Sequence, residues 1–337
     1  MAAARAHGAG YLGPVAASTP PSAPRGRPFA GRDDLHAMEQ CLVRSWQRAR
    51  PLVNTTPGDL EWWASSASPD EDWSRRIRVW TTGGDVVAYA WLNPPGELDW
   101  HQRADLEPAD RMAIVDETLA WLHETTDRRA RAGEVEPPLL ETWAMDADRE
   151  LTGLLAARGW TPQPWPGYTH WYRRLDGPAG AALPDPVVPG GYRLRHVRLP
   201  DDLAARVEAH RAAFAPSRMT VETYRRVVAM PRYAPERDVV VEAPDGSIAA
   251  FALVWWTPEA RVGELEPVGT HPDHQRRGLA RAVNLAALRL LQSEGAIDAL
   301  VFSRADNVAS ERLYASVGFE AVTRHRAWTW PGHTPGP

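Results

Sequence analysis

The order of predicted elements along the chain repeats once, and this repeat constrains the fold more than any other feature. Each half shows a helical pattern, two strands joined by a glycine-containing turn, a long helix, a strand and a short helix. In the first half these patterns cover 35–48, 78–92, 108–124, 139–143 and 149–157, and in the second half 203–214, 238–256, 279–292, 299–302 and 310–317. A glycine and an aromatic residue follow the last helix of each half, as Gly159-Trp160 and Gly318-Phe319. The sequence therefore predicts a duplicated protein of mixed α/β class.

The segment 176–191 separates the two halves. Its sequence, DGPAGAALPDPVVPGG, is rich in proline and glycine, which is typical of a linker. We therefore predict a first domain over 28–175 and a second domain over 192–331. Residues 1–27 are rich in alanine, proline and glycine and lack the apolar core of a signal peptide, so we predict a disordered tail there.

The composition limits the classes of function. The formal net charge is -5, which argues against a nucleic-acid partner, because such a partner selects a basic face. The chain has no lysine, so neither a P-loop nor a pyridoxal Schiff base can form. The single cysteine, Cys41, excludes an intramolecular disulfide, and we predict no metal site. No run approaches about 18 uninterrupted apolar residues, so we expect a cytoplasmic protein without a membrane partner.

A strand predicted over 263–270 carries two carboxylates. Because side chains alternate along a strand, Glu264, Glu266 and Val268 point to one face. One interpretation is a solvent-exposed strand face. The other is that one carboxylate lines a cleft and acts as a base.

The next segment, Gln275-Arg276-Arg277-Gly278-Leu279-Ala280, opens a helix. A helix N-terminus presents free backbone N–H groups and a partial positive charge, which together favour a phosphate. Gly278 has no side chain to block the approach, and the two arginines add charge. The simpler interpretation is an arginine-rich helix start with a chance glycine.

The last informative segment is SRADNVASERLYASVGF, over 303–319. Asn307 is suited to cap the helix that follows it, and Gly318 is suited to the left-handed residue that ends it. Tyr314 is either a packing residue or a phenol that takes part in chemistry.

In their order and spacing, these two segments resemble motifs of the GNAT superfamily of N-acetyltransferases, over about 192–330. The matching patterns are Gln-x-x-Gly-x-Ala after a strand, then Asn-x-x-Ser-x-x-Leu-Tyr and Gly-Phe. The resemblance implies two tandem GNAT-like domains, each a mixed, mostly antiparallel twisted sheet flanked by helices. It also implies acetyl-coenzyme A as the cosubstrate and direct attack of a neutral amine on the thioester.

The same resemblance implies roles for individual residues. Tyr314 would protonate the departing thiolate, and Glu264 or Glu266 would deprotonate the amine, directly or through water. The residues that would bind the coenzyme are Val268, Gly269, Thr270, Gln275, Arg276, Arg277, Gly278, Leu279, Ala280 and Asn307.

The first half departs from this pattern. Its matching segment, LDWHQRADLEPADRM over 98–112, has no Gln-x-x-Gly-x-Ala. Asp105, Glu107 and Asp110 would repel phosphates from its helix start. We therefore predict a degenerate GNAT-like domain that does not bind coenzyme A, within a layout like that of tandem GNAT proteins such as the mycothiol synthases.

The acceptor is predicted to be a primary amine of a small molecule. The alternatives are a protein N-acetyltransferase and a non-catalytic acyl-coenzyme A sensor, because acceptor pockets of this superfamily are built from variable segments. Twelve of the 16 tryptophans precede the linker, where they serve either as a substrate-binding wall or as core packing. The oligomeric state stays open.

Overall fold

The structure, a computed structural model, describes residues 23–67, 70–93, 96–133, 140–177 and 183–330. The elements of the first half are β1 (Arg25–Pro28), α1 (Arg32–Ala49), α2 (Pro57–Ser66), η1 (Trp73–Arg75), β2 (Ile77–Thr82), β3 (Asp85–Asn93), β4 (Glu97–Gln102), α3 (Pro108–Arg131), β5 (Leu140–Met145), α4 (Arg149–Ala157), β6 (Thr161–Pro162) and β7 (Tyr168–Arg174). Those of the second half are β8 (Arg193–His196), α5 (Leu203–Ala213), α6 (Val221–Val228), η3 (Pro235–Arg237), β9 (Asp238–Glu242), β10 (Ile248–Thr257), β11 (Val262–Thr270), η4 (Pro272–His274), α7 (Leu279–Ser293), β12 (Asp298–Arg304), α8 (Val308–Ser316) and β13 (Glu320–Trp330).

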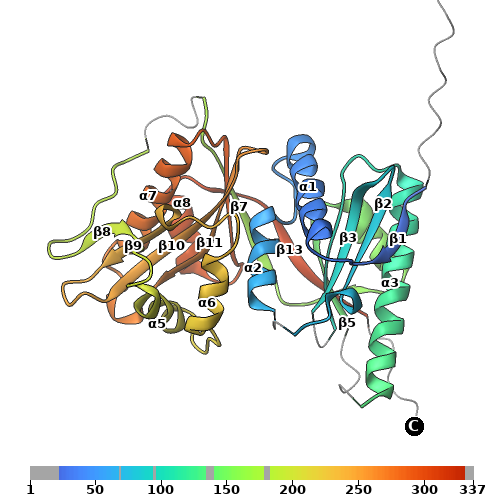
Figure 1. Cartoon of the computed structure of the whole chain (residues 1–337). Helices are drawn as coiled ribbons and strands as arrows, with labels where there is room; N and C mark the ends of the chain where they lie inside the picture. Colours follow the sequence, from blue (N-terminus) through green and yellow to red (C-terminus); the bar gives the residue numbers. More distant parts are fainter. Residues whose placement is uncertain (1–22, 68–69, 94–95, 134–139, 178–182, 331–337) are drawn as a thin grey trace, which may run out of the picture.

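The strands form one sheet that runs through both halves. Its order is β1-β2-β3-β4-β5-β13-β7-β12-β11-β10-β9-β8, with β6 paired to β13. Adjacent strands are antiparallel except in two pairs, β4 with β5 and β11 with β12. The predicted mixed, mostly antiparallel sheet flanked by helices is therefore confirmed (Figure 1).

The last strand of each half belongs to the sheet of the other half. β7, from the first half, pairs with β12, and β13, from the second half, pairs with β5. The two exchanged strands also pair with each other at the centre of the sheet (Figure 1). Backbone hydrogen bonds therefore join the halves without a break.

Helix α2 crosses from the first half to the second. It begins with a capping box, in which the Thr56 side chain accepts from backbone N–H groups and Asp59 accepts from the Thr56 N–H, and Pro57 occupies its first turn. Gly58 lies directly on Trp255 of β10, where a Cβ on the glycine would be 2.3 Å from the Cβ of Trp255. This close approach places Asp59 at the junction.

The core is shared in the same way. The apolar cluster around Met38, Trp46 and Leu60 of the first half also contains Val262 and Leu300 of the second half. The junction is therefore packed like the interior of a single domain.

Two predicted segments, the tail over 1–27 and the linker over 176–191, lie partly outside the described residues. Residues 1–22 of the predicted tail lie outside the described residues, while Arg25–Pro28 forms β1 and pairs with β2. In the predicted linker, 178–182 lies outside the described residues, and Leu183 is buried with its carbonyl accepting from Arg289.

Cys41 is buried in the core, and burial raises the pKa of its thiol to about 12. None of the helices in the described ranges is long and apolar enough to cross a membrane.

Asp298, at the start of β12, ties three segments together. It is fully buried, and its carboxylate accepts from Arg50 at 2.7 Å and from the Tyr172 hydroxyl at 2.6 Å. Arg50 follows α1 and Tyr172 lies on the exchanged strand β7, so this carboxylate links both halves.

We predict that Asp298→Ala lowers the free energy of unfolding by about 3 kcal/mol, because it removes the carboxylate from a buried ion pair. The measurement is the urea unfolding curve. The control is Asp185→Ala, which removes an exposed pair with Arg289 and should cost at most about 1 kcal/mol. Equal losses in the two variants would contradict the role given to Asp298.

Candidate active site

The parallel strands β11 and β12 pair only at one end. Val262, Gly263 and Glu264 face 298–300 of β12, and beyond that point the strands diverge. The divergence opens a cleft of about 940 Å³, bounded by both strands, the starts of α7 and α8, and α2 and β4 of the first half.

One wall of the cleft is the far end of β11. A β-bulge opposite 252–254 of β10 places one extra residue in this strand. Val268, Gly269 and Thr270 then line the cleft. Gly269 is required by packing, because an added Cβ would lie 2.3 Å from the ring of Phe251.

The start of α7 forms the second wall. Gly278 is the N-cap, with φ of 78°, and no side chain caps the helix, so its first N–H groups are free to bind an anion. Arg276 also has positive φ, at 60°. The predicted loop residues that line the cleft are Gln275, Arg276, Gly278, Leu279 and Ala280. Arg277 is not among them, and Arg281, which the sequence analysis did not select, is.

Helix α8 contributes Asn307 and Tyr314. Asn307 caps the helix, as predicted, with its side chain accepting from the Ser310 N–H at 3.2 Å. Tyr314 packs on Trp171 and Phe319, which agrees with the packing interpretation, and it also lines the cleft.

The two strand carboxylates differ in exposure. Glu264 is fully buried and accepts from the Thr56 hydroxyl of the α2 N-cap at 2.5 Å. Burial, and then the charge of Asp59, raise the pKa of Glu264 well above its usual range. Glu266 is only partly buried, and the same two causes raise its pKa to about 8.

The phenol of Tyr314 lies within the electrostatic reach of Glu266. Burial, and then the negative charge of Glu266, raise the pKa of Tyr314 above its usual range. The cleft thus brings together a carboxyl group that ionises near neutral pH and a phenol that keeps its proton. Such a pair can accept a proton from one reacting group and donate one to another.

Sequence reasoning missed the contribution of the first half. Asp59 of α2 and Glu97 and Asp99 of β4 line the same cleft as Glu264 and Glu266. The capping box at the start of α2 was a readable signal for that helix, but nothing local indicates that the helix faces β11. Of the tryptophans, Trp80, Trp91 and Trp100 are buried, whereas Trp62, Trp63 and Trp143 line the cleft.

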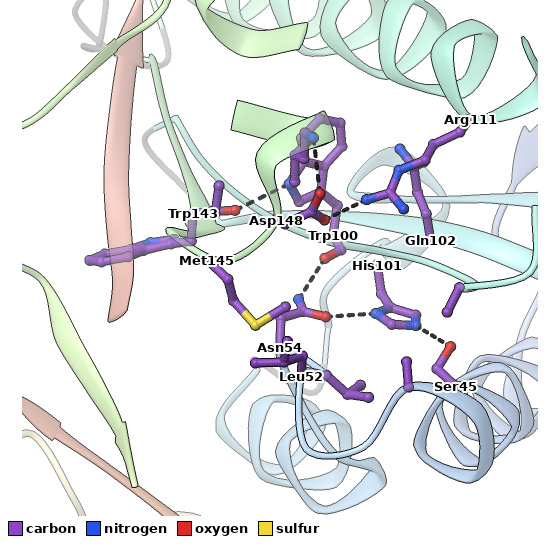
Figure 2. A pocket seen from close by; sticks show the side chains of 15 residues that line it. Ser45, Leu52, Asn54, Trp100, His101, Gln102, Arg111, Trp143, Met145 and Asp148 are labelled. Atoms are coloured by element: carbon purple, nitrogen blue, oxygen red, sulfur yellow. Dashed lines mark hydrogen bonds and ion pairs between the residues drawn. The ribbon is translucent and has the colours of Figure 1, made fainter. Parts of the chain in front are cut away.

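The first half contains a closed counterpart of the cleft. β4 and β5 also pair only at one end and then diverge, but the space between them is only about 80 Å³ (Figure 2). An ion pair between Arg111 of α3 and the α4 cap Asp148 crosses it. Counted along the chain from the helix cap, Leu155 of α4 occupies the position that Tyr314 occupies in α8. The first half therefore has no phenol at this position.

Three hydrogen-bonded side chains line this small cavity. His101 Nδ1 lies 2.6 Å from the Asn54 side-chain oxygen, and its Nε2 lies 2.8 Å from the Ser45 hydroxyl (Figure 2). Burial, and then the charge of Arg111, lower the pKa of His101 to about 3, so the imidazole is neutral. The cavity has little room for a ligand, and its polar side chains are only partly hydrogen-bonded, since the side-chain amide of Gln102 is buried without a partner.

Comparison with known proteins agrees with this geometry. The FR47-like protein family matches residues 247–329. The mycothiol acetyltransferase of Frankia alni is 31% identical over 267 residues, which are 73% of this chain and 75% of that protein. The chain belongs to the mycothiol acetyltransferase family. Other mycothiol acetyltransferases, from Frankia casuarinae and Streptomyces bingchenggensis, are 31% and 32% identical over 45% and 44% of this chain. The chain spans about half of their length, 48% and 49%.

Solved structures show the fold of this mycothiol acetyltransferase family member. A GCN5-related N-acetyltransferase from Sphaerobacter thermophilus has a TM-score of 0.62 at 19% identity, covering 92% of this chain and 96% of that one. A tandem GNAT protein from the clavulanic acid biosynthesis pathway has a TM-score of 0.60 at 17% identity, covering 91% and 98%. The predicted resemblance to tandem GNAT proteins is confirmed.

We predict that the contribution of Glu266 to the stability of the ligand-free protein falls as pH rises from about 5 to about 8. In the unfolded chain Glu266 ionises near pH 4, whereas in the folded state its pKa is about 8. The folded state therefore holds the proton more tightly, and this stabilisation is complete at low pH and is lost as pH rises. Glu266→Gln removes the effect, so its stability relative to wild type should rise by up to about 1.4 kcal/mol per pH unit in this window.

The measurement is urea unfolding at pH 6 and pH 8. Glu208→Gln, on the exposed side of α5, serves as the control. A stability difference between Glu266→Gln and wild type that is the same at both pH values would contradict the burial of this charge.

Proposed function

We propose that this chain is an acetyl-coenzyme A-dependent N-acetyltransferase that acts on a primary amine of a small molecule. The observation that carries the proposal is the open divergence of β11 and β12. It surrounds one cleft with an anion-binding helix start, a carboxyl group of raised pKa and a protonated phenol.

The residues present fit the coenzyme. The backbone of 268–270 is free of β12 and is placed to hydrogen-bond the pantetheine arm. The N–H groups at the start of α7, with Arg276 and Arg281, suit the pyrophosphate. The space above the Gly278 backbone is open, since a Cβ built there meets nothing within 4 Å. The bound coenzyme supplies the activated acetyl group.

Glu266 is the residue that we assign as the base. It takes the proton from the acceptor ammonium, and the freed amine nitrogen then attacks the thioester carbon. Tyr314 gives its proton to the departing sulfur as the carbon–sulfur bond breaks. The attacking nitrogen then loses its second proton to the phenolate, which leaves a neutral amide and restores the phenol. Glu264 is further from solvent and is held by Thr56, so it supports Glu266.

The walls of the cleft favour a small acceptor over a protein. α2 and β4 of the first half close the acceptor end with side chains such as Asp59, Trp62 and Glu97. The name shared by the curated relatives, mycothiol acetyltransferase, also supports a small molecule. The presence of both Glu266 and Tyr314 in one cleft favours a catalytic role over a role as an acyl-coenzyme A sensor.

We predict that coenzyme A binds with a stoichiometry of one per chain and that Gly278→Glu abolishes binding. The new side chain would place a negative charge where the phosphates bind. Isothermal titration calorimetry measures both quantities. The control is Gly246→Glu, since Gly246 has a similar positive φ of 85° and open space but lies outside the cleft. Two equal sites per chain, or normal binding by Gly278→Glu, would exclude the proposed site.

We predict that wild-type kcat/KM rises with pH through about 8, where Glu266 ionises, and that Glu266→Gln lacks this rise. Loss of the base should cost about 100-fold or more in kcat/KM at pH 7. Tyr314→Phe should lower kcat by about 100-fold, the low end for an acid that protonates a good leaving group, with little change in coenzyme affinity.

The measurement is a pH–rate profile with a thiol-release assay and a panel of amines. The control is Tyr233→Phe, a partly buried tyrosine whose hydroxyl bonds to Asp238 outside the cleft. Profiles of Glu266→Gln and Tyr314→Phe that match wild type in height and shape would remove both residues from the chemistry.

A further inference from the structure

We propose that His325 of β13 binds a hydroxyl group of the acceptor and thereby helps to select it. This inference rests on the proposed function, in which the amine of the same acceptor lies at Glu266. It gives the exchanged strand β13, which the proposed chemistry does not use, a direct contact with the substrate.

His325 lies in the wall of the cleft, at the centre of the sheet. Its cross-strand neighbours are Met145 of β5 and Tyr168 of β7. His325 and Tyr168 both line the cleft. Two strands, β7 and β12, separate β13 from β11. The proposed coenzyme site lies on β11 and at the start of α7, so a ligand that reaches His325 is the acceptor.

Neither ring nitrogen of His325 has a hydrogen-bond partner among the described residues. The residue is only 9% exposed, and its Nε2 atom is buried and unpaired. Buried polar atoms almost always have a partner, and one that lacks it costs free energy. A ligand in the cleft is placed to supply that partner.

Buried histidines elsewhere in the protein bond to neighbouring side chains. His101 does so through both ring nitrogens, to Asn54 and to Ser45. His210 Nδ1 lies 3.2 Å from the Ser217 hydroxyl. Neither of these histidines lines the cleft. An imidazole inside this fold can therefore be satisfied by the protein itself.

A second unpaired histidine, His170, lies behind His325. It is fully buried, and neither of its nitrogens has a partner. Its ring centroid lies 5.5 Å from that of His325 and 4.8 Å from that of Phe302. His170 does not line the cleft, so His325 is the member of this pair that a ligand can reach.

A hydroxyl is the ligand group that matches His325. Burial lowers the pKa of His325 to about 4, so its imidazole is neutral at neutral pH. One nitrogen of a neutral imidazole donates a hydrogen bond and the other accepts one, and a hydroxyl can take either part. A second ammonium group has carboxylates elsewhere in the cleft, such as Glu97 and Asp99, and gains less from a neutral ring.

The surroundings of His325 in the cleft are aromatic. The ring of Phe302 lies 4.9 Å from that of His325, and Trp143 packs against Tyr168 with ring centroids 5.4 Å apart. All four side chains line the cleft. Pockets for small molecules combine such apolar walls with a few polar groups that orient the ligand. His325 would orient the far end of the acceptor while Glu266 engages its amine.

The kinetic test compares two series of amines with the full-length enzyme and acetyl-coenzyme A. One series runs from 3-amino-1-propanol to 8-amino-1-octanol, and the other contains the n-alkylamine of each chain length. At the length that spans Glu266 and His325, the amino alcohol should have a kcat/KM at least about fivefold higher. The alkylamine is the more apolar of each pair, so hydrophobic binding alone gives the opposite preference.

Variants test whether His325 is the source of this preference. His325→Phe and His325→Leu remove both nitrogens with side chains of different shape, so the test does not depend on the folding of one variant. Each should lower the kcat/KM ratio to about one or below. His325→Gln, whose amide still donates and accepts, should keep a ratio of at least about two.

The matched control is His123→Phe. His123 packs against Trp330 with ring centroids 4.2 Å apart and does not line the cleft, so this variant should keep the wild-type ratio. Damage to packing alone would lower the kcat/KM of both amines and leave their ratio unchanged. The ratio therefore separates a contact with the acceptor from a structural role of His325.

A binding test is independent of turnover. Ligand-observed NMR titrations are run on the full chain with coenzyme A present, for every member of both series. At the preferred length, wild type should bind the amino alcohol at least about fivefold more tightly than the alkylamine. His325→Phe and His325→Leu should lose this difference, and His123→Phe should keep it.

The outcomes separate the two proposals. Acetylation in which no amino alcohol exceeds its matching alkylamine keeps the proposed function and overturns the role of His325. A binding preference that the His325 variants lose, without acetylation of any amine, keeps the role of His325 and overturns the proposed function. A preference that persists in His325→Phe or His325→Leu overturns the role of His325, whatever the activity.

Discussion

The exchange of the terminal strands is the constraint on which the rest of the structure depends. β13 lies between β5 and β7, and β7 lies between β13 and β12, so the junction is built from backbone hydrogen bonds. Without the exchanged strands, β5 and β12 would each present an unpaired edge. The continuous sheet holds α2 against β10, and it therefore fixes Asp59 relative to Glu264. The geometry of the cleft therefore depends on the pairing of β7 and β13 with β5 and β12, which lies outside the cleft.

The two halves use the same divergence of parallel strands in different ways. In the second half the divergence stays open, and the space above Gly278 at the start of α7 is clear. In the first half Arg111 and Asp148 close it, and Leu155 stands where the second half has Tyr314. Although its own cavity is small, the first half contributes β4, whose carboxylates line the cleft of the second half. The first half thus forms part of the wall of the cleft in the second half.

Local pattern predicted many of the elements, and one of them, α4, at its observed bounds. It missed short or polar elements such as β1, β8 and α2, whose apolar periodicity is weak. It also missed the two exchanged strands, β7 and β13, and so could not predict the exchange. Periodicity, where it does indicate a strand, does not show which strand it pairs with. The same limit applies to the site. Gln275–Ala280 and Tyr314 lie in contiguous motifs, whereas Asp59 reaches Glu264 only through the tertiary fold.

Charge is separated along the cleft, and this separation has a chemical consequence. At one end the start of α7, with Arg276 and Arg281, favours anions. At the other end buried carboxylates have no arginine partners, so desolvation keeps Glu266 and Asp99 largely protonated until pH approaches 8. Because these carboxyl groups are protonated in the empty cleft, most of the free-energy cost of burying charge is avoided. A cation that binds beside them favours their ionised form. On the proposed function, a phosphate-bearing donor and a cationic acceptor would therefore enter from opposite ends of the cleft, with their reactive ends between Glu266 and Tyr314.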